Sequence, residues 1–503
     1  MGAEVTGLTF TREDRARFRS RVLRGTEAID RMLSEGLFTD HSTQPEPLLG
    51  MEVELNLVDS QMNPAMCNEA ILADLGSDTY ESELGQFNIE LNLDPQPLKA
   101  SHAMDFADDL RVALNRLEAM ATEHGAHTVM IGMLPTLTAV HFDQQWLSQS
   151  NRYERLEEQI FAARGEDLVL DIEGSAFDGE IEELHVVTGT ILPEAACTSM
   201  QLHLRLAPED FANHWNAAQA FAGAQVALAA NSPFLDHKAL WHETRLPLFA
   251  QATDIRPVEL KNQGVRPRVW FGERWISNIF DLFEENTRYF PALLPESSPI
   301  DPLDELDAGR IPDLTELKMH NGTIWRWNRP VYDTVGGHPH VRIENRTLPS
   351  GPTLLDMMAN AAFFYGTTTS LAREDRPIWT RMSFDAAEQN LTAGGRDGMD
   401  ARLYWPKVGW VSPDELTHRI LLPHAHHGLE ALGVDSAVRD RLLAVIEGRC
   451  ATKQNGASWQ RDHVARREAA GENRVDAIAG MLREYIDRMH SGDPVHTWDR
   501  PSA

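Results

Sequence analysis

The sequence contains little cysteine and no long apolar run. Three cysteines occur among its 503 residues, far apart and without a CxxC pair: Cys67, Cys197 and Cys450. This spacing argues against a disulfide scaffold and a thiolate zinc site, so we interpret the three as packing residues. The most apolar stretch, residues 217–230, contains two glutamines and is too short to cross a bilayer. Because no signal-peptide pattern opens the chain, we expect a soluble, cytoplasmic protein without a membrane partner.

Basic residues are scarce relative to acidic ones. The chain has 46 Lys and Arg against 76 Asp and Glu, a formal net charge of −30 at pH 7. A surface of this sign repels phosphate backbones, so we expect no nucleic-acid partner. The hydrophobic fraction of 42% is enough for a large core and argues against disorder.

A regular βαβ alternation is also missing, as is a glycine-rich phosphate turn after the first predicted strand. Alternation and apolar runs predict strands that are interleaved with helices, which favours an α+β fold with a mainly antiparallel sheet over a Rossmann core. The predicted strands are residues 48–59, 87–93, 128–133, 199–206, 323–328 and 341–346.

Helical spacing occupies much of the remaining chain. A capping box at Thr11 opens the first helix, and further helices are predicted within residues 105–124, 208–231, 352–371 and 412–490. We expect three parts: an N-terminal helical segment (1–47), a catalytic domain (48–400) and a helical C-terminal region (401–503).

Each predicted strand has one polar face, because side chains alternate along a strand. For one strand, a half-exposed sheet is a sufficient explanation. Together the residue types argue against it, since Asn and Glu are disfavoured in strands and lysine is absent from these faces. The polar positions are Glu52, Glu54 and Asn56; Asn88, Glu90 and Asn92; Gln201, His203 and Arg205; and Arg342, Glu344 and Arg346.

Clustered carboxylates repel one another, so something cationic must offset their charge. Arginines supply part of it, and oxygen-rich ligation with one imidazole suits Mg²⁺ or Mn²⁺ better than Zn²⁺. We therefore predict a cupped sheet whose concave polar face holds metal. Phosphoryl transfer from ATP is the leading chemistry for such a face. Metal-dependent hydrolysis and a non-catalytic relative that binds a nucleotide or amino acid remain alternatives.

Six motifs in the same order resemble glutamate–cysteine ligase family 2, the carboxylate–amine ligases. They extend over about residues 48–372 and include a turn after the long helix and a following arginine. The motifs are Gly50–Asp59, Glu83 with Glu90, Gln201–Leu204, Ala229–Phe234, Thr244–Arg245 and Arg342–Arg346.

The resemblance implies a glutamine synthetase-like fold and an ATP-dependent ligase reaction through an acyl phosphate. Its substrates would be glutamate or a related carboxylate, and an amine such as cysteine. By position, Arg346 would stabilise the transferring phosphoryl group and Arg245 would bind a substrate carboxylate. Asn231 and Arg326 are further candidates for substrate or ATP binding. The implied ligands of Mg²⁺ are Glu52, Glu54, Glu83, Glu90, His203 and Glu344.

Some features leave questions open. Many relatives carry a second histidine where this chain has Gln201. The arginine-rich segment 254–275 is either a lid over the nucleotide or a surface loop. Residues 424–427 contain three histidines, for which we favour a loop or helix end over a metal site. We also expect Glu54→Gln or Glu344→Gln to abolish activity while sparing or raising stability. The amine and the oligomeric state are not predicted.

Overall fold

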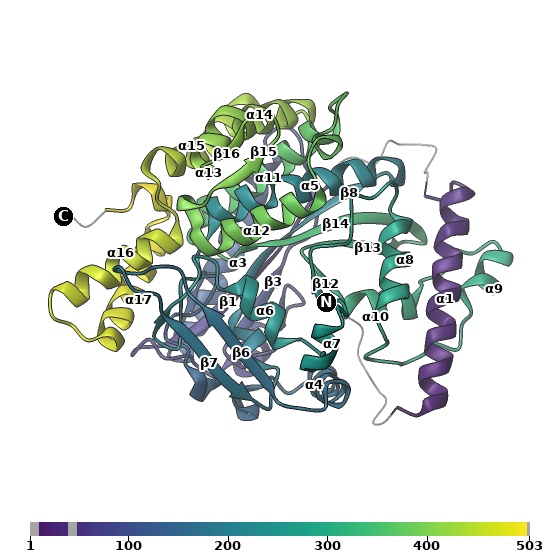
Figure 1. The fold of residues 1–503 in the computed structure, drawn as a ribbon, viewed down its shortest axis with the longest axis horizontal. Coiled ribbons are helices and arrows are strands. Elements are labelled where there is room, and N and C mark those ends of the chain that lie inside the picture. The colour runs from purple at the N-terminus through teal and green to yellow at the C-terminus, as the bar shows by residue number, and fades with distance from the viewer. Residues whose placement is uncertain (1–9, 39–47, 500–503) are drawn as a thin grey trace.

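The computed structural model describes residues 10–38 and 48–499. One large sheet, in the strand order β13-β14-β8-β1-β3-β2, extends through the middle of the molecule (Figure 1), and β4 and β5 also pair with β1. Every pairing within it is antiparallel. Its strands are β1 (Leu48–Asp59), β2 (Tyr80–Ser82), β3 (Asn88–Asn92), β4 (Gln96–Pro97), β5 (Ala126–Val129), β8 (Ser199–Leu206), β13 (Asn328–Val335) and β14 (His338–Pro349).

The α+β class and the antiparallel sheet are as predicted. The bounds expected for β1 and β8 are confirmed, and β14 is longer than its predicted core. The single strand expected at 323–328 is wrong. Trp325–Arg326 instead forms a short strand, β12, which pairs in parallel with β11 (Val269–Trp270), and Asn328 begins β13. Within the main sheet, Asn328 pairs with Asn345 of β14.

The apolar face of the sheet packs against long helices. Met51, Val53 and Leu55 of β1 are at most 2% exposed. Tyr365, on α11 (Leu354–Ala372), donates its hydroxyl to the carbonyl oxygens of Gly50 and His203 and so joins this helix to β1 and β8. Helices α3 (His102–Glu123) and α5 (Pro208–Ala229) contribute further to this layer.

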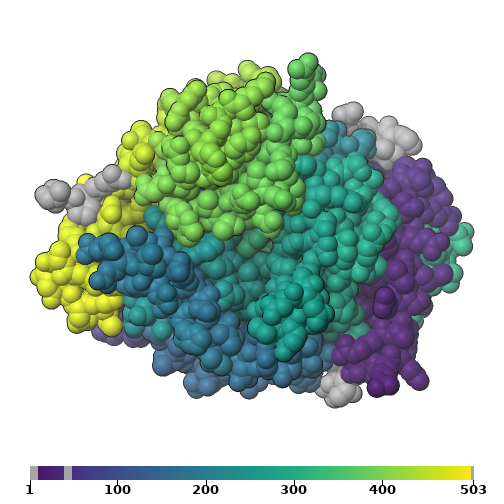
Figure 2. Space-filling model, viewed as in Figure 1, coloured from purple at the N-terminus to yellow at the C-terminus, as the bar shows by residue number. Residues whose placement is uncertain are grey.

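The N-terminal helix α1 (Arg12–Ser34) lies along one side of the molecule (Figures 1 and 2, purple). The predicted capping box is confirmed: Thr11 accepts from the backbone of Asp14, whose carboxylate accepts from Thr11 in return. Arg21 and Arg24 both pair with Asp301. The helix is thereby held against α8 (Phe280–Tyr289), α9 (Pro302–Asp307) and α10 (Thr315–Gly322).

The C-terminal region is helical, as expected, and lies on the side opposite α1 (Figure 1). Arg449 pairs with Asp356 of α11 at 2.7 Å, and Asn455 donates to the carbonyl oxygen of Ala227 in α5. Buried polar contacts therefore join this region to the core, and the division into three parts stays a prediction. Its helices are α13 (Pro413–Leu416), α14 (Leu422–Ala431), α15 (Ser436–Thr452), α16 (Gly456–Ala469) and α17 (Arg474–Ser491).

The sequence patterns did not reveal a hairpin of β6 (Leu168–Glu173) and β7 (Glu183–Thr188), which is visible at the front of Figure 1.

No described helix is both long and apolar enough to span a membrane. The three cysteines are unbonded. The other elements are α2 (Asn68–Leu75), α4 (Asn151–Arg164), α6 (Arg245–Ala252), α7 (Val258–Asn262), β9 (Phe234–Leu235), β10 (Lys238–Ala239), α12 (Phe384–Asp397), β15 (Leu403–Trp405) and β16 (Gly409–Val411).

Candidate active site

A cavity of about 330 Å³ opens on the polar face of the sheet. The strands place acids and an arginine on its floor, because directly opposed residues of antiparallel strands share a face. Glu54 pairs in register with Glu90, Glu52 with Gln201, and Arg329 with Glu344. The charged residues of the lining are Glu52, Glu54, Glu83, Glu90, Arg152, Glu194, Asp313, Lys318, Arg329, Asp333, Arg342, Glu344 and Arg346.

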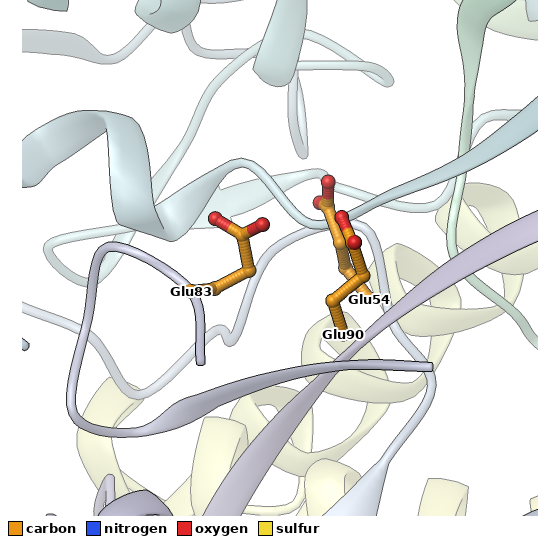
Figure 3. A group of neighbouring side chains, drawn as sticks. All are labelled: Glu54, Glu83 and Glu90. Carbon is orange, nitrogen blue, oxygen red and sulfur yellow. The ribbon is translucent and has the colours of Figure 1, made fainter. Parts of the chain in front are cut away.

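Three of these acids, Glu54, Glu83 and Glu90, form a group that we call the acidic triad. One carboxylate oxygen from each lies within 4.8 Å of the others. Glu54 and Glu90 project side by side from neighbouring strands, and Glu83, from the loop after β2, points toward them (Figure 3). Burial and the neighbouring carboxylates raise the pKa of Glu90 to about 7 and that of Glu83 well above its ordinary value.

Glu54 is held in place by hydrogen bonds as well as by its strand. It accepts from the backbone N–H of Ser199 at 2.6 Å and from the amide of Gln201 at 2.8 Å. Gln201 in turn accepts from Arg346 at 2.5 Å. The glutamine at the position where many relatives carry a histidine therefore orients one triad acid and connects it to Arg346.

The other two acids of the sheet, Glu52 and Glu344, already have cationic or histidine partners; we call them the paired acids. Glu344 is 1% exposed and accepts from Arg346 at 2.6 Å and Arg329 at 2.7 Å. Burial raises its pKa, but the two guanidinium groups outweigh that effect and lower it well below the ordinary value. Glu52 contacts His203 at 2.9 Å, and this partner, against the effect of burial, lowers its pKa to about 2.

The hydrogen bonds of His203 define which ring nitrogen carries the proton. Arg342 donates to Nδ1 at 3.1 Å, so Nδ1 accepts. The proton then lies on Nε2, which donates to Glu52. His203 itself lies beside the cavity lining, behind Glu52.

The donor set fits a hard divalent cation. Three closely spaced carboxylates with raised pKa values gain most from a bound positive charge, and oxygen ligands suit Mg²⁺ or Mn²⁺. The Nε of Arg346 is buried and has no hydrogen-bond partner among the described residues, as expected of a group that binds an anion. Carboxylates and an incompletely satisfied guanidinium thus face one space, which suits a metal-bound phosphate.

Three predicted binding residues lie elsewhere, and the expectation of direct contact needs correction. Arg245 is 3% exposed and pairs with Glu243 at 2.6 Å. Arg326 is fully buried, pairs with Glu285 at 2.9 Å and stacks on Trp270. Asn231 is fully buried and donates to the carbonyl oxygen of Ser350 and to Tyr485. None of the three lines the cavity.

The open questions from the sequence also receive answers. The arginines of segment 254–275 have structural partners: Arg256 pairs with Asp254, Arg266 with Glu273, and Arg268 donates to carbonyl oxygens. The first two pairs lie within the segment, whereas Arg268 joins it to Thr323 and Pro291. His424 and His426 lie on helix α14, and the described residues offer a metal only the acidic triad.

Sequence reasoning missed several charged residues of the cavity lining, among them Arg329 and Glu194. Arg329 lies on β13, which forms a hairpin with β14 through Gly336 and Gly337, both at positive φ. This glycine pair was a readable hairpin signal and would have placed Arg329 opposite Glu344. Glu194 lies on a 3₁₀ turn (Leu192–Ala196) before β8, where no alternation marks it. Burial and the proximity of Glu54 raise its pKa to about 7.

Solved structures with distant similarity include three ligases or synthetases. The glutamate–cysteine ligase of Francisella tularensis, in complex with AMP, has a TM-score of 0.47 at 13% identity. The match covers 91% of this chain and 90% of the ligase chain. A bifunctional glutathione synthetase from Pasteurella multocida has a TM-score of 0.45 at 11% identity, and the match covers 93% of this chain and 55% of the synthetase chain. The ligase PafA in complex with the prokaryotic ubiquitin-like protein Pup has a TM-score of 0.35 at 9% identity, and the match covers 88% of this chain and 73% of the matched chain.

No curated protein matches the chain. The model of glutamate–cysteine ligase family 2, by contrast, matches residues 48–480. The match extends beyond the motifs, which end near residue 372, and includes most of the C-terminal helices. It also contains the whole acidic triad, both paired acids and Arg346. The chain therefore belongs to glutamate–cysteine ligase family 2.

Proposed function

We propose that this protein is an ATP-dependent carboxylate–amine ligase. A carboxylate oxygen of the acid substrate attacks the γ-phosphorus of ATP, and the bond to the ADP oxygen breaks. The amine nitrogen then attacks the acyl carbon of the resulting acyl phosphate. The carbon–oxygen bond to phosphate breaks, and an amide, phosphate and one proton are released. The observation that carries the proposal is that the acidic triad and two arginines, Arg329 and Arg346, line one cavity.

Arg346 is the residue best suited to stabilise the transferring phosphoryl group. Its Nη1 donates to both Glu344 and Gln201, and its buried Nε has no hydrogen-bond partner among the described residues. The attraction of Glu344 and Glu54 outweighs burial and raises its pKa, so it remains charged. A guanidinium group fixed in this way meets developing charge without reorganisation. Glu344 and Gln201 serve to position it.

Magnesium, or manganese, would be held by the acidic triad and would neutralise phosphate charge; Glu52, His203 and Glu344, the other ligands that the resemblance implies, already contact one another or arginines. In our proposal the paired acids also keep Arg346 and His203 oriented. The adenine would lie against the apolar wall of the cavity, because bases stack on such surfaces. That wall consists of Phe283, Leu294, Leu317, Met319 and Trp325.

Glu194 is our candidate for holding the ammonium group of the amine substrate. It lines the cavity, and the charges of Glu54 and Arg346 act on it. Its carboxylate has no hydrogen-bond partner among the described residues. A carboxylate in this position attracts a cation and repels a second acid. The amine, cysteine or a related compound, would therefore enter with its ammonium group toward Glu194.

The test is release of ADP from Mg·ATP by the purified protein. The assay contains glutamate alone, or glutamate with one member of an amine panel that includes cysteine. Release that depends on both an acid and an amine supports the ligase and names its substrates. The Glu54→Gln variant serves as the inactive control, because Glu54 belongs to the acidic triad.

Two other outcomes have defined meanings. Binding of Mg·ATP without release for any acid–amine pair would overturn turnover with these substrates and favour a binding protein. Absence of ATP binding, together with metal-dependent hydrolysis of a phosphate ester or amide, would overturn the ligase and favour a hydrolase on the same carboxylates.

A further inference from the structure

A second cavity, of about 250 Å³, lies on the opposite face of the sheet from the active site. Its wall is formed by α3, α11, α15 and α17, with β1 and the end of β5. The base is apolar and buried: each residue there is at most 7% exposed. The base consists of Leu55, Ala107, Met130, Met358, Leu442 and Met489.

The mouth of this cavity carries two arginines, although the chain as a whole is acidic. Arg111 and Arg441 both line it and are exposed, in a protein whose formal net charge is −30. Arg111 pairs with Asp108 on its own helix, whereas Arg441 has no hydrogen bond or ion pair within residues 10–38 and 48–499. His490 is also exposed at the mouth.

The acid that lines the mouth is already occupied. Glu118 receives hydrogen bonds at both carboxylate oxygens, one from His127 and the other from the backbone and hydroxyl of Thr128. Its side chain is committed to these donors, and because Arg111 pairs with Asp108, Arg441 is the arginine of the mouth that has no ion pair among the described residues. An apolar chamber with free cationic charge at its entrance is complementary to a molecule with an apolar tail and an anionic head.

We propose that this cavity is a binding site for a monocarboxylate with an unbranched apolar tail, such as a medium-chain fatty acid. The tail occupies the space between α3 and α11, and the carboxylate lies between Arg111 and Arg441. Protein interiors pack densely, so an open apolar space of this size between four helices is an exception. The site is separate from the proposed ligase reaction and does not depend on it.

The cavity is placed to influence the active site. Leu55 belongs to its base, and its neighbour on β1, Glu54, projects to the other face as part of the acidic triad. Met358 belongs to α11, whose Tyr365 contacts Gly50 and His203. A bound tail thus contacts both the strand and the helix that position the metal-binding acids.

The experiment is isothermal titration calorimetry on the full chain with hexanoate, octanoate and decanoate, without ATP. We expect saturable binding with one site per chain. Burial of a methylene contributes about 0.8 kcal/mol, so affinity should rise roughly fourfold per added methylene until the cavity is full. Decyltrimethylammonium, which has the same tail length and a cationic head, should not bind.

Variants separate this site from general adsorption of amphiphiles. Arg111→Glu with Arg441→Glu should weaken decanoate binding at least tenfold, and Leu114→Trp should weaken it by filling the cavity. Arg483→Glu is the matched control, because Arg483 is exposed on α17 and lies outside the lining. Equal binding of the cationic amphiphile, unchanged affinity in both test variants, or no binding by the wild type would each overturn the proposal.

Discussion

The acidic triad and the paired acids share one face of one sheet, yet their charges are offset in different ways. Glu52 and Glu344 have a histidine and two arginines within hydrogen-bond distance, and their pKa values are lowered. Glu83 and Glu90 face other carboxylates, and their pKa values are raised. The same residue type thus has opposite electrostatic behaviour a few ångströms apart.

This difference gives separate roles to two acids of the same sequence motif, Gly50–Asp59. Glu52 and Glu54 are two residues apart on β1, but one orients His203 and the other belongs to a group of acids that has no ion pair among the described residues. In our proposal the triad takes up a cation from solution, whereas the paired acids organise the arginines that meet phosphate. The following predictions test that division, beginning with the largest expected effect.

Arg346→Met should lower kcat by about a thousandfold or more, because a guanidinium group that stabilises a transferring phosphoryl group contributes on that scale. The KM for ATP should change much less. Steady-state ADP release measures both values. Arg310→Met is the control, since Arg310 forms an exposed surface pair with Glu305. A fall of less than tenfold would remove Arg346 from the reaction.

Glu344→Gln and Glu90→Gln should change metal-free stability in opposite directions. Glu344→Gln leaves two partly buried arginines without their buried acidic partner and should cost about 3 kcal/mol. Glu90→Gln removes a repelling charge and should leave stability unchanged or slightly higher. Urea unfolding in EDTA measures both. The sequence-based expectation that Glu344→Gln spares stability is thereby revised.

Equal loss in the two variants would contradict the division into triad and paired acids. Metal binding offers an independent check, because Glu90→Gln should abolish high-affinity Mn²⁺ binding in a titration. A Glu90→Gln variant that binds Mn²⁺ like the wild type would exclude the triad as the metal site.

Glu90 should contribute a loss of stability to the metal-free protein as pH rises from about 4.5 to about 7. Glu90 has a folded-state pKa of about 7, above the value of about 4.3 for an unfolded-state carboxyl. Within this window the folded state keeps a proton that the unfolded state has released, so rising pH favours unfolding. One such group contributes up to about 1.4 kcal/mol per pH unit. Unfolding free energies of wild type and Glu90→Gln, measured across the window, should diverge, with the flatter profile for the variant.

Glu194→Gln should have the smallest effect of the four. We expect the KM for the amine to rise by about tenfold, equivalent to about 1.4 kcal/mol, with little change in the KM for the acid. Glu158→Gln, on the exposed face of α4, is the control. An unchanged KM for the amine, with normal folding, would show that Glu194 does not hold the substrate's ammonium group.

Alternation along the strands was sufficient to find much of the site. Five of the six predicted metal ligands line the cavity, and the sixth, His203, contacts Glu52. A period of two fixes which residues share a face, and antiparallel pairing then brings the faces together. The same logic could not find Glu194, because an irregular turn positions it, independent of any strand period.

Burial explains why other predictions misplaced residues. Arg245 and Asn231 lie within motifs that resemble functional ones, and Arg326 lies in a predicted strand, but each binds buried partners. A sequence does not show whether an arginine faces a ligand or an internal acid, since both uses require the same charge. Glu243 and Glu285, the two internal partners, gave no sequence signal of their own.

The order of the strands along the chain has a consequence for biosynthesis. Strands β1 and β3, which carry Glu52, Glu54 and Glu90, lie within the first hundred residues, whereas β13 and β14, which carry Arg329 and Arg346, lie after residue 327. A ribosome therefore produces the repelling half of the sheet long before the compensating half. Contacts between distant chain segments also form slowly. The nascent N-terminal half carries an unfinished, strongly acidic sheet edge, which its own charge protects from premature association.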